Sequence, residues 1–211
     1  MMKNTEWGTV AYLSHSKYGR CTNGTCEELT KNNCSNLITG IGADTVDADE
    51  SSTTCTTDKN KYNGENGVKA STTGNVYGVY DMSGGSYEYT MGNMVDSSNQ
   101  FYTMFVENWS TTTYPLAKYY DSYTYGTTYN DNNAYSRGRL GDATVEMAPT
   151  GGITGNWYSD YAMFPCESAP WFVRGGYYTH GYTAGAFGFN DYDGIVNKES
   201  SFRISLVAQA S

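Results

Sequence analysis

Side chains able to perform metal, redox or nucleophilic chemistry are sparse in this sequence and follow no familiar catalytic pattern. It contains two histidines, His15 and His180, and five cysteines. The cysteine spacing fits no zinc signature, because neither a paired C-x-x-C nor a nearby ligand histidine accompanies it. No serine lies in the pattern of a hydrolase nucleophile elbow. The acidic residues between Asp44 and Glu50 lack the Gly of an EF-hand loop, so we interpret them as solvated loop residues.

The region after residue 176 is instead rich in side chains suited to recognition by contact. Tyrosine offers a large contact area with only two torsions to freeze, so an exposed tyrosine gains affinity at a low ordering cost. Asparagine and aspartate supply hydrogen-bond acceptors. A shallow patch is therefore expected from Tyr177, His180, Tyr182 and Tyr192, with acceptors from Asn190, Asp191 and Asp193. The alternative for each tyrosine is a half-buried packing role.

Three predicted strands, at 171–176, 184–189 and 201–207, must hold these loops in place. Their large apolar side chains are predicted to form the core: Trp171, Phe172, Phe187, Phe189 and Phe202. Arg174 and Arg203 lie on the same strands, where a buried guanidinium needs a partner. We expect both to be structural, bonded to backbone carbonyls or to a carboxylate.

Further elements are predicted upstream of these strands. Residues 5–18 place Trp7, Val10 and Ala11 at helical spacings, with Thr5 as N-cap and Gly19 just past the end. Two β-type runs flank a Gly-containing turn near 74–90, with Tyr87 and Tyr89 on one face and Glu88 on the other. A short helix is predicted between Gly138 and Pro149, from the spacing of Leu140, Ala143, Thr144 and Met147.

Residues 20–70 are predicted to be a long, loosely packed insert, because apolar periodicity is almost absent there. Four of the five cysteines lie in this stretch. We expect two disulfides among Cys21, Cys26, Cys34 and Cys55, with Cys166 alone. Five reduced thiols are the alternative.

Composition limits the class of protein and of partner. The 211 residues, with a formal charge of −9 and a pI near 4.6, fit one domain with few basic side chains. Nucleic acid and anionic membranes are therefore unfavourable partners. We expect neither a membrane helix nor a signal-peptide core.

Three ordered motifs resemble a known family. They are Gly78-Val79-Tyr80-Asp81-Met82-Ser83-Gly84 followed by Tyr87-Glu88-Tyr89, then Arg174-Gly175-Gly176, and finally Ser201-Phe202-Arg203. This order is similar to that of the formylglycine-generating-enzyme type of C-type lectin fold. The resemblance implies an α+β, C-type lectin-like fold with short strands, about two helices and much irregular loop, spanning 1–211 as a single domain.

The catalytic members of that family are not a good match. Formylglycine-generating enzymes use a cysteine pair between the last two motifs to bind copper, and residues 174–203 contain no cysteine. The related sulfoxide synthases need a histidine cluster for iron, which two histidines cannot supply. We therefore expect no cofactor, no metal and no catalytic residue.

The chain resembles more closely the variable proteins of diversity-generating retroelements, which display a ligand-binding patch near the C-terminus of this scaffold. A frame of Gly, Ala and Phe residues alternates here with residue types typical of their variable positions. The resemblance implies a variable segment at 171–207. Its expected ligand-binding residues are Tyr177, Thr179, His180, Tyr182, Thr183, Gly188, Asn190, Asp191, Tyr192, Asp193 and Ile195.

The sequence therefore predicts a non-catalytic receptor or adhesin, extracellular or displayed on a cell envelope, pilus or virion. Its expected partner is a protein or glycan ligand on another cell or virion. Two alternatives stay open: a formylglycine-generating-type enzyme with a relocated site, and an invariant structural domain of a phage or pilus surface.

Overall fold

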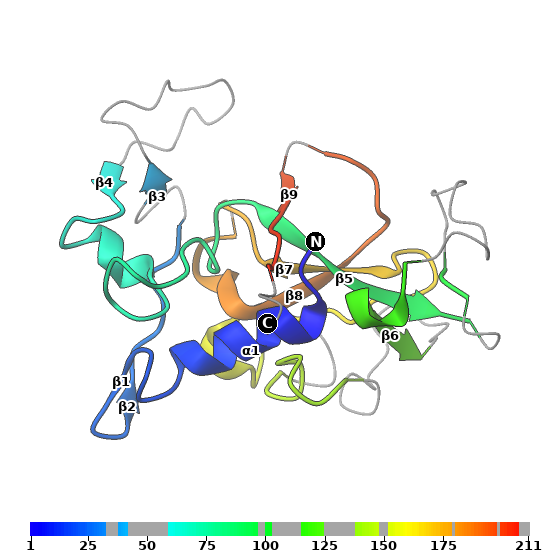
Figure 1. Cartoon of the computed structure of the whole chain (residues 1–211), viewed down its shortest axis with the longest axis horizontal. Helices are drawn as coiled ribbons and strands as arrows, with labels where there is room; N and C mark the ends of the chain where they lie inside the picture. The colour runs from blue at the N-terminus through cyan, green and yellow to red at the C-terminus, as the bar shows by residue number, and fades with distance from the viewer. Residues whose placement is uncertain are drawn as a thin grey trace, which may run out of the picture.

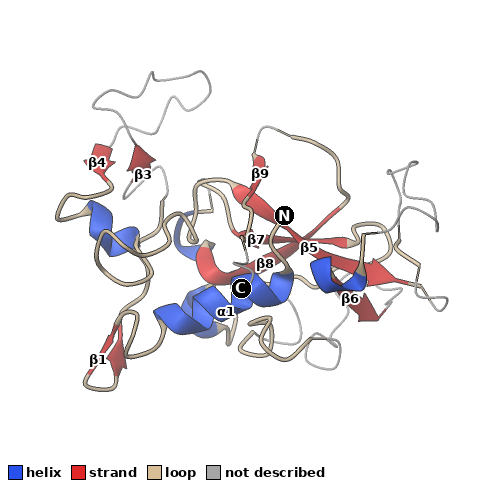
Figure 2. Cartoon of the chain, viewed as in Figure 1, coloured by secondary structure: helices blue, strands red, loops and turns tan. Residues whose placement is uncertain are grey.

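The protein is a mixed α and β structure built around one curled sheet (Figure 1). Figure 2 shows that long loops join its strands, most of which are short. This confirms the predicted α+β class at the level of secondary structure. The computed structural model describes residues 1–32, 38–41, 59–96, 100–102, 115–124, 138–147, 152–178, 180–197 and 199–206.

The sheet has five strands, with β5 (Tyr87–Val95) in the middle. On one side β5 pairs antiparallel with β7 (Trp171–Gly175), and β7 pairs antiparallel with β8 (Gly185–Tyr192). On the other side β5 pairs in parallel with β6 (Asp121–Thr124) and β9 (Ser200–Phe202). All three predicted C-terminal strands are therefore present, although β9 is much shorter than 201–207.

Side chains alternate along these strands, so the sheet has two chemically different faces. On one face, the rings of Phe172 and Phe189 lie 5.7 Å apart between their centroids. On the opposite face, the ring of Tyr192 lies 5.8 Å from that of Tyr87 and 5.8 Å from that of Tyr89. We call these the Phe face and the Tyr face.

Helix α1 (Asn4–Ser14) covers the Phe face, and its buried Trp7 and Ala11 agree with the prediction. The helix ends earlier than the predicted residue 18. Ser14 Oγ donates to the Ala11 carbonyl at 2.6 Å, and the Ser14 carbonyl accepts from the Arg20 backbone N–H at 2.7 Å. The chain therefore turns directly after Ser14. The helix also starts one residue before the predicted N-cap Thr5.

The core lies between α1 and the Phe face. Four of the five predicted core rings are buried, namely those of Trp171, Phe172, Phe187 and Phe189. The prediction is wrong for Phe202, which is 62% exposed. Its strand lies at the edge of the sheet, where no layer covers it in the described part of the chain.

The predicted helix between Gly138 and Pro149 is wrong, because residues 138–147 form turns. The Asp142 carboxylate accepts hydrogen bonds from the backbone N–H groups of Arg139 at 2.7 Å and Thr144 at 3.1 Å. Such side-chain bonds compete with helical ones. Ala143 has a φ of 57°, and Leu140 is fully exposed.

The prediction of a first β-strand in the 74–90 hairpin is also wrong, because residues 74–78 form turns and bends. Asn75 Oδ1 accepts from the Tyr77 backbone N–H at 2.9 Å, which makes a turn, and Tyr77 is exposed. The second run is the start of β5. As predicted, Tyr87 and Tyr89 lie on one face, and Glu88 bonds to Arg203 on the other.

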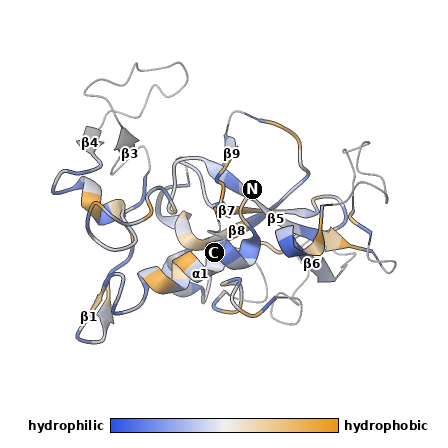
Figure 3. Cartoon of the chain, viewed as in Figure 1, coloured by the Kyte–Doolittle hydropathy of each residue, from blue (hydrophilic) through white to orange (hydrophobic). Residues whose placement is uncertain are grey.

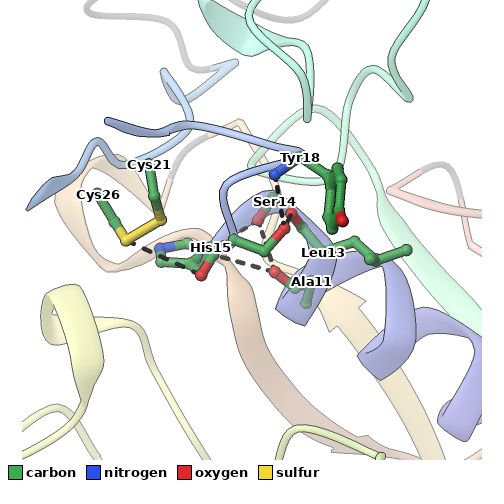
Figure 4. Close-up of a disulfide and its surroundings, with 8 residues drawn as sticks. Ala11, Leu13, Ser14, His15, Tyr18, Cys21 and Cys26 are labelled. Atoms are coloured by element: carbon green, nitrogen blue, oxygen red, sulfur yellow. Dashed lines mark hydrogen bonds between the residues drawn. A yellow bond between two sulfur atoms is a disulfide. The ribbon is translucent and has the colours of Figure 1, made fainter. Parts of the chain in front are cut away.

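Within the described residues of the 20–70 stretch there are four short strands. β1 (Cys21–Thr22) and β2 (Thr25–Cys26) pair antiparallel, and the Cys21–Cys26 disulfide joins them (Figure 4). β3 (Ile38–Ile41) and β4 (Lys59–Lys61) pair in parallel. The Cys21–Cys26 bond is one of the two disulfides expected among the first four cysteines; Cys34 and Cys55, the remaining two, lie outside the described residues. Cys166 is free, as predicted.

The same stretch is packed more firmly than predicted at Leu29, which is buried in the core.

Along the rest of the described chain, hydrophobic residues occur in short segments, which are coloured orange in Figure 3. Among the described helices, none has the length and apolar character of a membrane span. The described ranges also contain 3-10 helices at Gly67–Ala70, Ala117–Tyr119, Trp157–Ser159 and Gly181–Thr183.

Candidate functional site

An aromatic cluster forms on the Tyr face, with Tyr87 at its centre. The Tyr87 ring lies 5.1 Å from the rings of both Tyr177 and His180, and 5.8 Å from that of Tyr192. Tyr89 joins it through Tyr192. We call these five residues the Tyr cluster. Three separate segments supply its rings: β5, β8 and the connection between β7 and β8.

Hydrogen bonds fix three hydroxyl groups of the Tyr cluster, those of Tyr87, Tyr89 and Tyr192. Asn190 Nδ2 donates to the Tyr87 hydroxyl at 3.1 Å. The Tyr89 hydroxyl donates to the Ile195 carbonyl at 3.2 Å, and Asn197 Nδ2 donates to the Tyr192 hydroxyl at 2.6 Å. The loop after β8 is therefore tied to the rings that precede it, and the cluster is organised before any ligand arrives.

The imidazole of His180 lies inside this arrangement. Its Nε2 is 3.1 Å from the Tyr87 hydroxyl, and its ring centroid is 4.3 Å from that of Tyr177. Burial lowers the pKa of His180 below its ordinary value of 6.5, although the charge of Glu199 opposes this shift. The ring is therefore neutral at pH 7 and acts as an aromatic and hydrogen-bonding group.

The predicted ligand-binding residues differ widely in exposure. Tyr182 is 67% exposed and Ile195 is 47% exposed. The half-buried residues are Tyr177, His180, Thr183, Asn190, Tyr192 and Asp193. Tyr177 and Tyr192 thus have part of the packing role that was the alternative interpretation. Thr179 lies outside the described residues.

Gly188 and Asp191 differ most from the expectation of an exposed patch, because both are buried. A Cβ atom on Gly188 would lie 3.0 Å from the Gly185 carbonyl oxygen, so Gly188 serves the packing of β8. Asp191 is on the Phe-face side of the alternation, opposite Phe172 in the β7–β8 register. Neither belongs to a freely exposed contact surface.

The turn that carries Tyr182 is held by residues that sequence reasoning missed. Lys31 Nζ donates to the Tyr182 carbonyl at 2.5 Å and pairs with Glu28 at 2.8 Å. It also lies 3.9 Å from Asp160. Burial raises the pKa of Asp160 to about 8, against the opposing charge of Lys31. Lys31 lies in a polar, aperiodic stretch, so no sequence signal identified it.

The two arginines have the structural roles that were predicted. Arg174 is fully buried and donates from Nη1 to the Asp142 carbonyl at 3.1 Å and to Asn4 Oδ1 at 3.3 Å. Burial lowers the pKa of Arg174 to about 10. Arg203 pairs with Glu88 and donates to the Tyr80 carbonyl at 3.2 Å. Each arginine therefore joins segments that are distant in sequence and stabilises the scaffold that carries the site.

A pocket of about 350 Å³ opens at the end of β8, next to the Tyr cluster. Two carboxylates, those of Asp191 and Asp193, are among its lining groups. The Asp191 carboxylate also accepts a hydrogen bond from the Cys166 thiol at 3.7 Å. The remaining lining residues are Ser168, Ala169, Tyr192, Ile195 and Asn197.

No protein-family model, curated protein or solved structure matches this chain. Its function must therefore be argued from the site. Within the described ranges, no three His, Cys, Asp or Glu side chains come together as metal ligands would.

Sequence reasoning found part of this site and missed the rest. The alternation of Tyr87, Glu88 and Tyr89 indicated a tyrosine face, but not that β8 lies beside it. Ser168, Ala169 and Asn197 were not predicted. Ser168 and Ala169 reach the pocket through a turn, which is closed by hydrogen bonds between the backbones of Cys166 and Ala169. No local sequence pattern predicted this turn.

Proposed function

We propose that this chain is a non-catalytic ligand-binding protein of the receptor or adhesin type, and that the Tyr cluster with its neighbouring pocket is its binding surface. The observation that carries this proposal is the convergence of β5, β8 and the β7–β8 connection on one aromatic cluster beside a pocket. Aromatic side chains near a pocket are typical of binding surfaces.

The site is suited to rigid recognition. Tyr177, Tyr192 and His180 are half-buried, so each ring keeps surface for a ligand while its own position is fixed by neighbours. Tyr182 and Ile195 add exposed contact area. A fixed surface of this kind loses little conformational entropy when it binds.

The proposed scaffold is the C-type lectin-like fold of the formylglycine-generating-enzyme type. Arg174 and Arg203 support it, because the two motif arginines tie β7 and the C-terminal segment to neighbouring backbone carbonyls. The proposed subclass is the variable proteins of diversity-generating retroelements, which places the protein on a cell envelope, pilus or virion and its ligand, a protein or glycan, on another cell or virion.

A genomic observation tests the variable-protein part of this proposal. The DNA around the gene should hold a near-identical repeat of the codons for residues 171–207 next to a reverse-transcriptase gene. Differences between the two copies should fall at adenines in codons for 177–195. A gene without such a repeat would favour an invariant structural domain.

A binding experiment tests the surface itself. The protein is applied to glycan and peptide arrays, and the signals are compared with those of Tyr182→Ala. Signals that fall at least tenfold in the variant, at an unchanged melting temperature, support the proposal. Tyr77→Ala is the matched control, since Tyr77 is 92% exposed and lies outside the cluster. Equal loss in both variants would place binding elsewhere.

A further inference from the structure

The pocket at the end of β8 has walls from two segments that are distant in sequence. Ser168 and Ala169 come from the turn before β7, and Asp191 to Asn197 come from the end of β8 and the loop that follows. Its volume of about 350 Å³ is at the small end of ligand pockets. A pocket of this size fits one side chain or one small group of a larger ligand.

The charge of this pocket is one-sided. Its only charged lining residues among those described are Asp191 and Asp193, and no lysine or arginine lines it. Asp193 Oδ1 accepts the Ile195 backbone N–H at 2.9 Å, which fixes the loop, and within the described part of the chain its second oxygen accepts no hydrogen bond. The whole chain carries a formal charge of −9, which adds to the attraction for a cation.

Asp191 is the more unusual of the two carboxylates, because it is only 8% exposed. The Cys166 thiol, 3.7 Å from Oδ2, is a weak donor and carries no positive charge. Burial accordingly raises the pKa of Asp191 to about 6, so the carboxylate is still ionised at pH 7. A buried anion of this kind is stabilised when a cation enters the pocket.

The Tyr192 ring gives the pocket an aromatic wall. Its hydroxyl accepts from Asn197, and its ring rests against Tyr89, so its position is fixed. Ile195 adds an apolar edge. Long basic side chains pack their methylene stems on such surfaces and keep the charged head on polar groups.

From this arrangement we propose that the pocket is a subsite for the side chain of a lysine or arginine on a protein ligand, with the cationic head between Asp191 and Asp193 and the stem along Tyr192. This inference rests on the proposed ligand-binding function and names the chemistry that it recognises. Both carboxylates are acceptors, which suits a head that carries N–H donors.

Two other cations fit this pocket less well. Calcium takes six to eight oxygen ligands, whereas the described lining side chains offer two carboxylates and the hydroxyls of Ser168 and Tyr192 besides the Asn197 amide. That amide is already engaged, since its oxygen accepts from the Glu199 backbone and its nitrogen donates to Tyr192. Quaternary ammonium groups prefer a cage of several rings, and among the described residues only the Tyr192 ring lines this pocket.

The test is an NMR titration of the whole chain with n-butylammonium and, separately, n-butylguanidinium. Saturable shifts are expected in the backbone amides of Ser168, Ala169 and 191–197. Neutral n-butanol should give no saturable shift, and tetramethylammonium, which has no N–H donor, should bind at least tenfold more weakly. The stronger of the two butyl probes identifies lysine or arginine as the preferred side chain.

Charge-removing variants make the test specific. Asp191→Asn and Asp193→Asn keep the shape of each side chain and should each weaken n-butylammonium binding at least tenfold. Glu65→Gln removes the same charge from an exposed position outside the pocket and should leave binding unchanged. Asp193→Asn decides the question if Asp191→Asn does not fold.

Equal binding of all four probes, or equal affinity of Asp193→Asn and Glu65→Gln, would overturn the inference. This failure is distinguishable from failure of the proposed function. If Tyr182→Ala abolishes array binding while n-butylammonium does not bind, the receptor function stands and only the basic-side-chain subsite is wrong.

Discussion

The two faces of the central sheet are built from the same strands, but their aromatic side chains differ in how deeply they are buried. On the Phe face, Phe172, Phe187 and Phe189 are almost completely enclosed by α1 and neighbouring loops. On the Tyr face, Tyr177 and Tyr192 are only half-buried, and the hydroxyls of Tyr87 and Tyr192 are bonded to other side chains.

The difference teaches how one short strand can serve stability and recognition together. Because alternate residues of β8 point to opposite sides, Phe189 packs in the core while Asn190 and Tyr192 support the surface cluster. We infer that the Phe face supplies most of the stability, and that the Tyr face tolerates exchange of side chains more readily.

The largest expected effect comes from emptying the Phe face. Phe172→Ala should lower the free energy of unfolding by about 3–5 kcal/mol, because it leaves a cavity in a packed core. Tyr177→Ala, the matched change on the Tyr face, should cost about 1–2 kcal/mol because its ring is half-buried. Urea unfolding measures both. Similar losses would contradict the proposed division of labour.

The second prediction concerns the close approach of β8 to a buried carboxylate. A Cβ atom on Gly185 would lie 1.9 Å from both Asp160 carboxylate oxygens. Gly185→Ala should therefore destabilise the fold by about 3 kcal/mol, through overpacking. Gly188→Ala, whose nearest contact would be 3.0 Å, should cost less in the same unfolding assay. The reverse ranking would show that the carboxylate moves aside freely.

The third prediction is a pH dependence that originates at Asp160. Its pKa is about 8 in the folded protein and near 3.8 when unfolded, so the folded state holds the proton more tightly. This stabilising contribution is complete below about pH 4 and is lost as the pH rises to about 8. The facing charges are Lys31 at 3.9 Å and Glu28, which pairs with Lys31.

Asp160→Asn removes this titration and keeps an oxygen that accepts the Phe187 N–H. Relative to wild type, the variant should gain on the order of 2 kcal/mol between pH 6.5 and pH 8.5. Urea unfolding at both pH values tests the difference. A constant difference at both pH values would mean that Asp160 is ionised throughout.

The smallest expected effect is at the exposed edge of the site. Tyr182→Ala should change the free energy of unfolding by less than about 0.5 kcal/mol, because its side chain is exposed and its carbonyl bond to Lys31 does not depend on the ring. Thermal unfolding gives the value. A shift of several degrees would show that Tyr182 packs against the protein, which would blur the distinction between the faces.

Much of the secondary structure was predictable, because the sequence patterns that indicate it are local. The apolar residues of β7 and β8 and the helical spacing of Trp7 and Ala11 indicated their elements directly. The turn at Asp142 was not predictable, because its buried carboxylate is set by long-range packing: it accepts a hydrogen bond from Tyr123 on β6. The same applies to the end of α1, where the bond from Arg20 depends on how the following loop folds back.

The candidate site was predictable in its residue types but not in its geometry. Tyrosine and aspartate after residue 176 indicated a binding surface, yet the burial of Asp191 follows from its alternation and from Cys166, 25 positions away in sequence. No sequence pattern indicated that Lys31 or Asp160 would lie near the site. Both become important only because the chain brings them to the Tyr182 turn.

Tyr192 belongs to both the Tyr cluster and the pocket wall. A change of this ring to suit a new ligand would therefore also loosen its contacts with Tyr87 and Tyr89. Position 192 should consequently evolve together with its packing neighbours, whereas Tyr182 can vary independently. Even a surface open to diversification would then contain one position whose changes require compensation elsewhere.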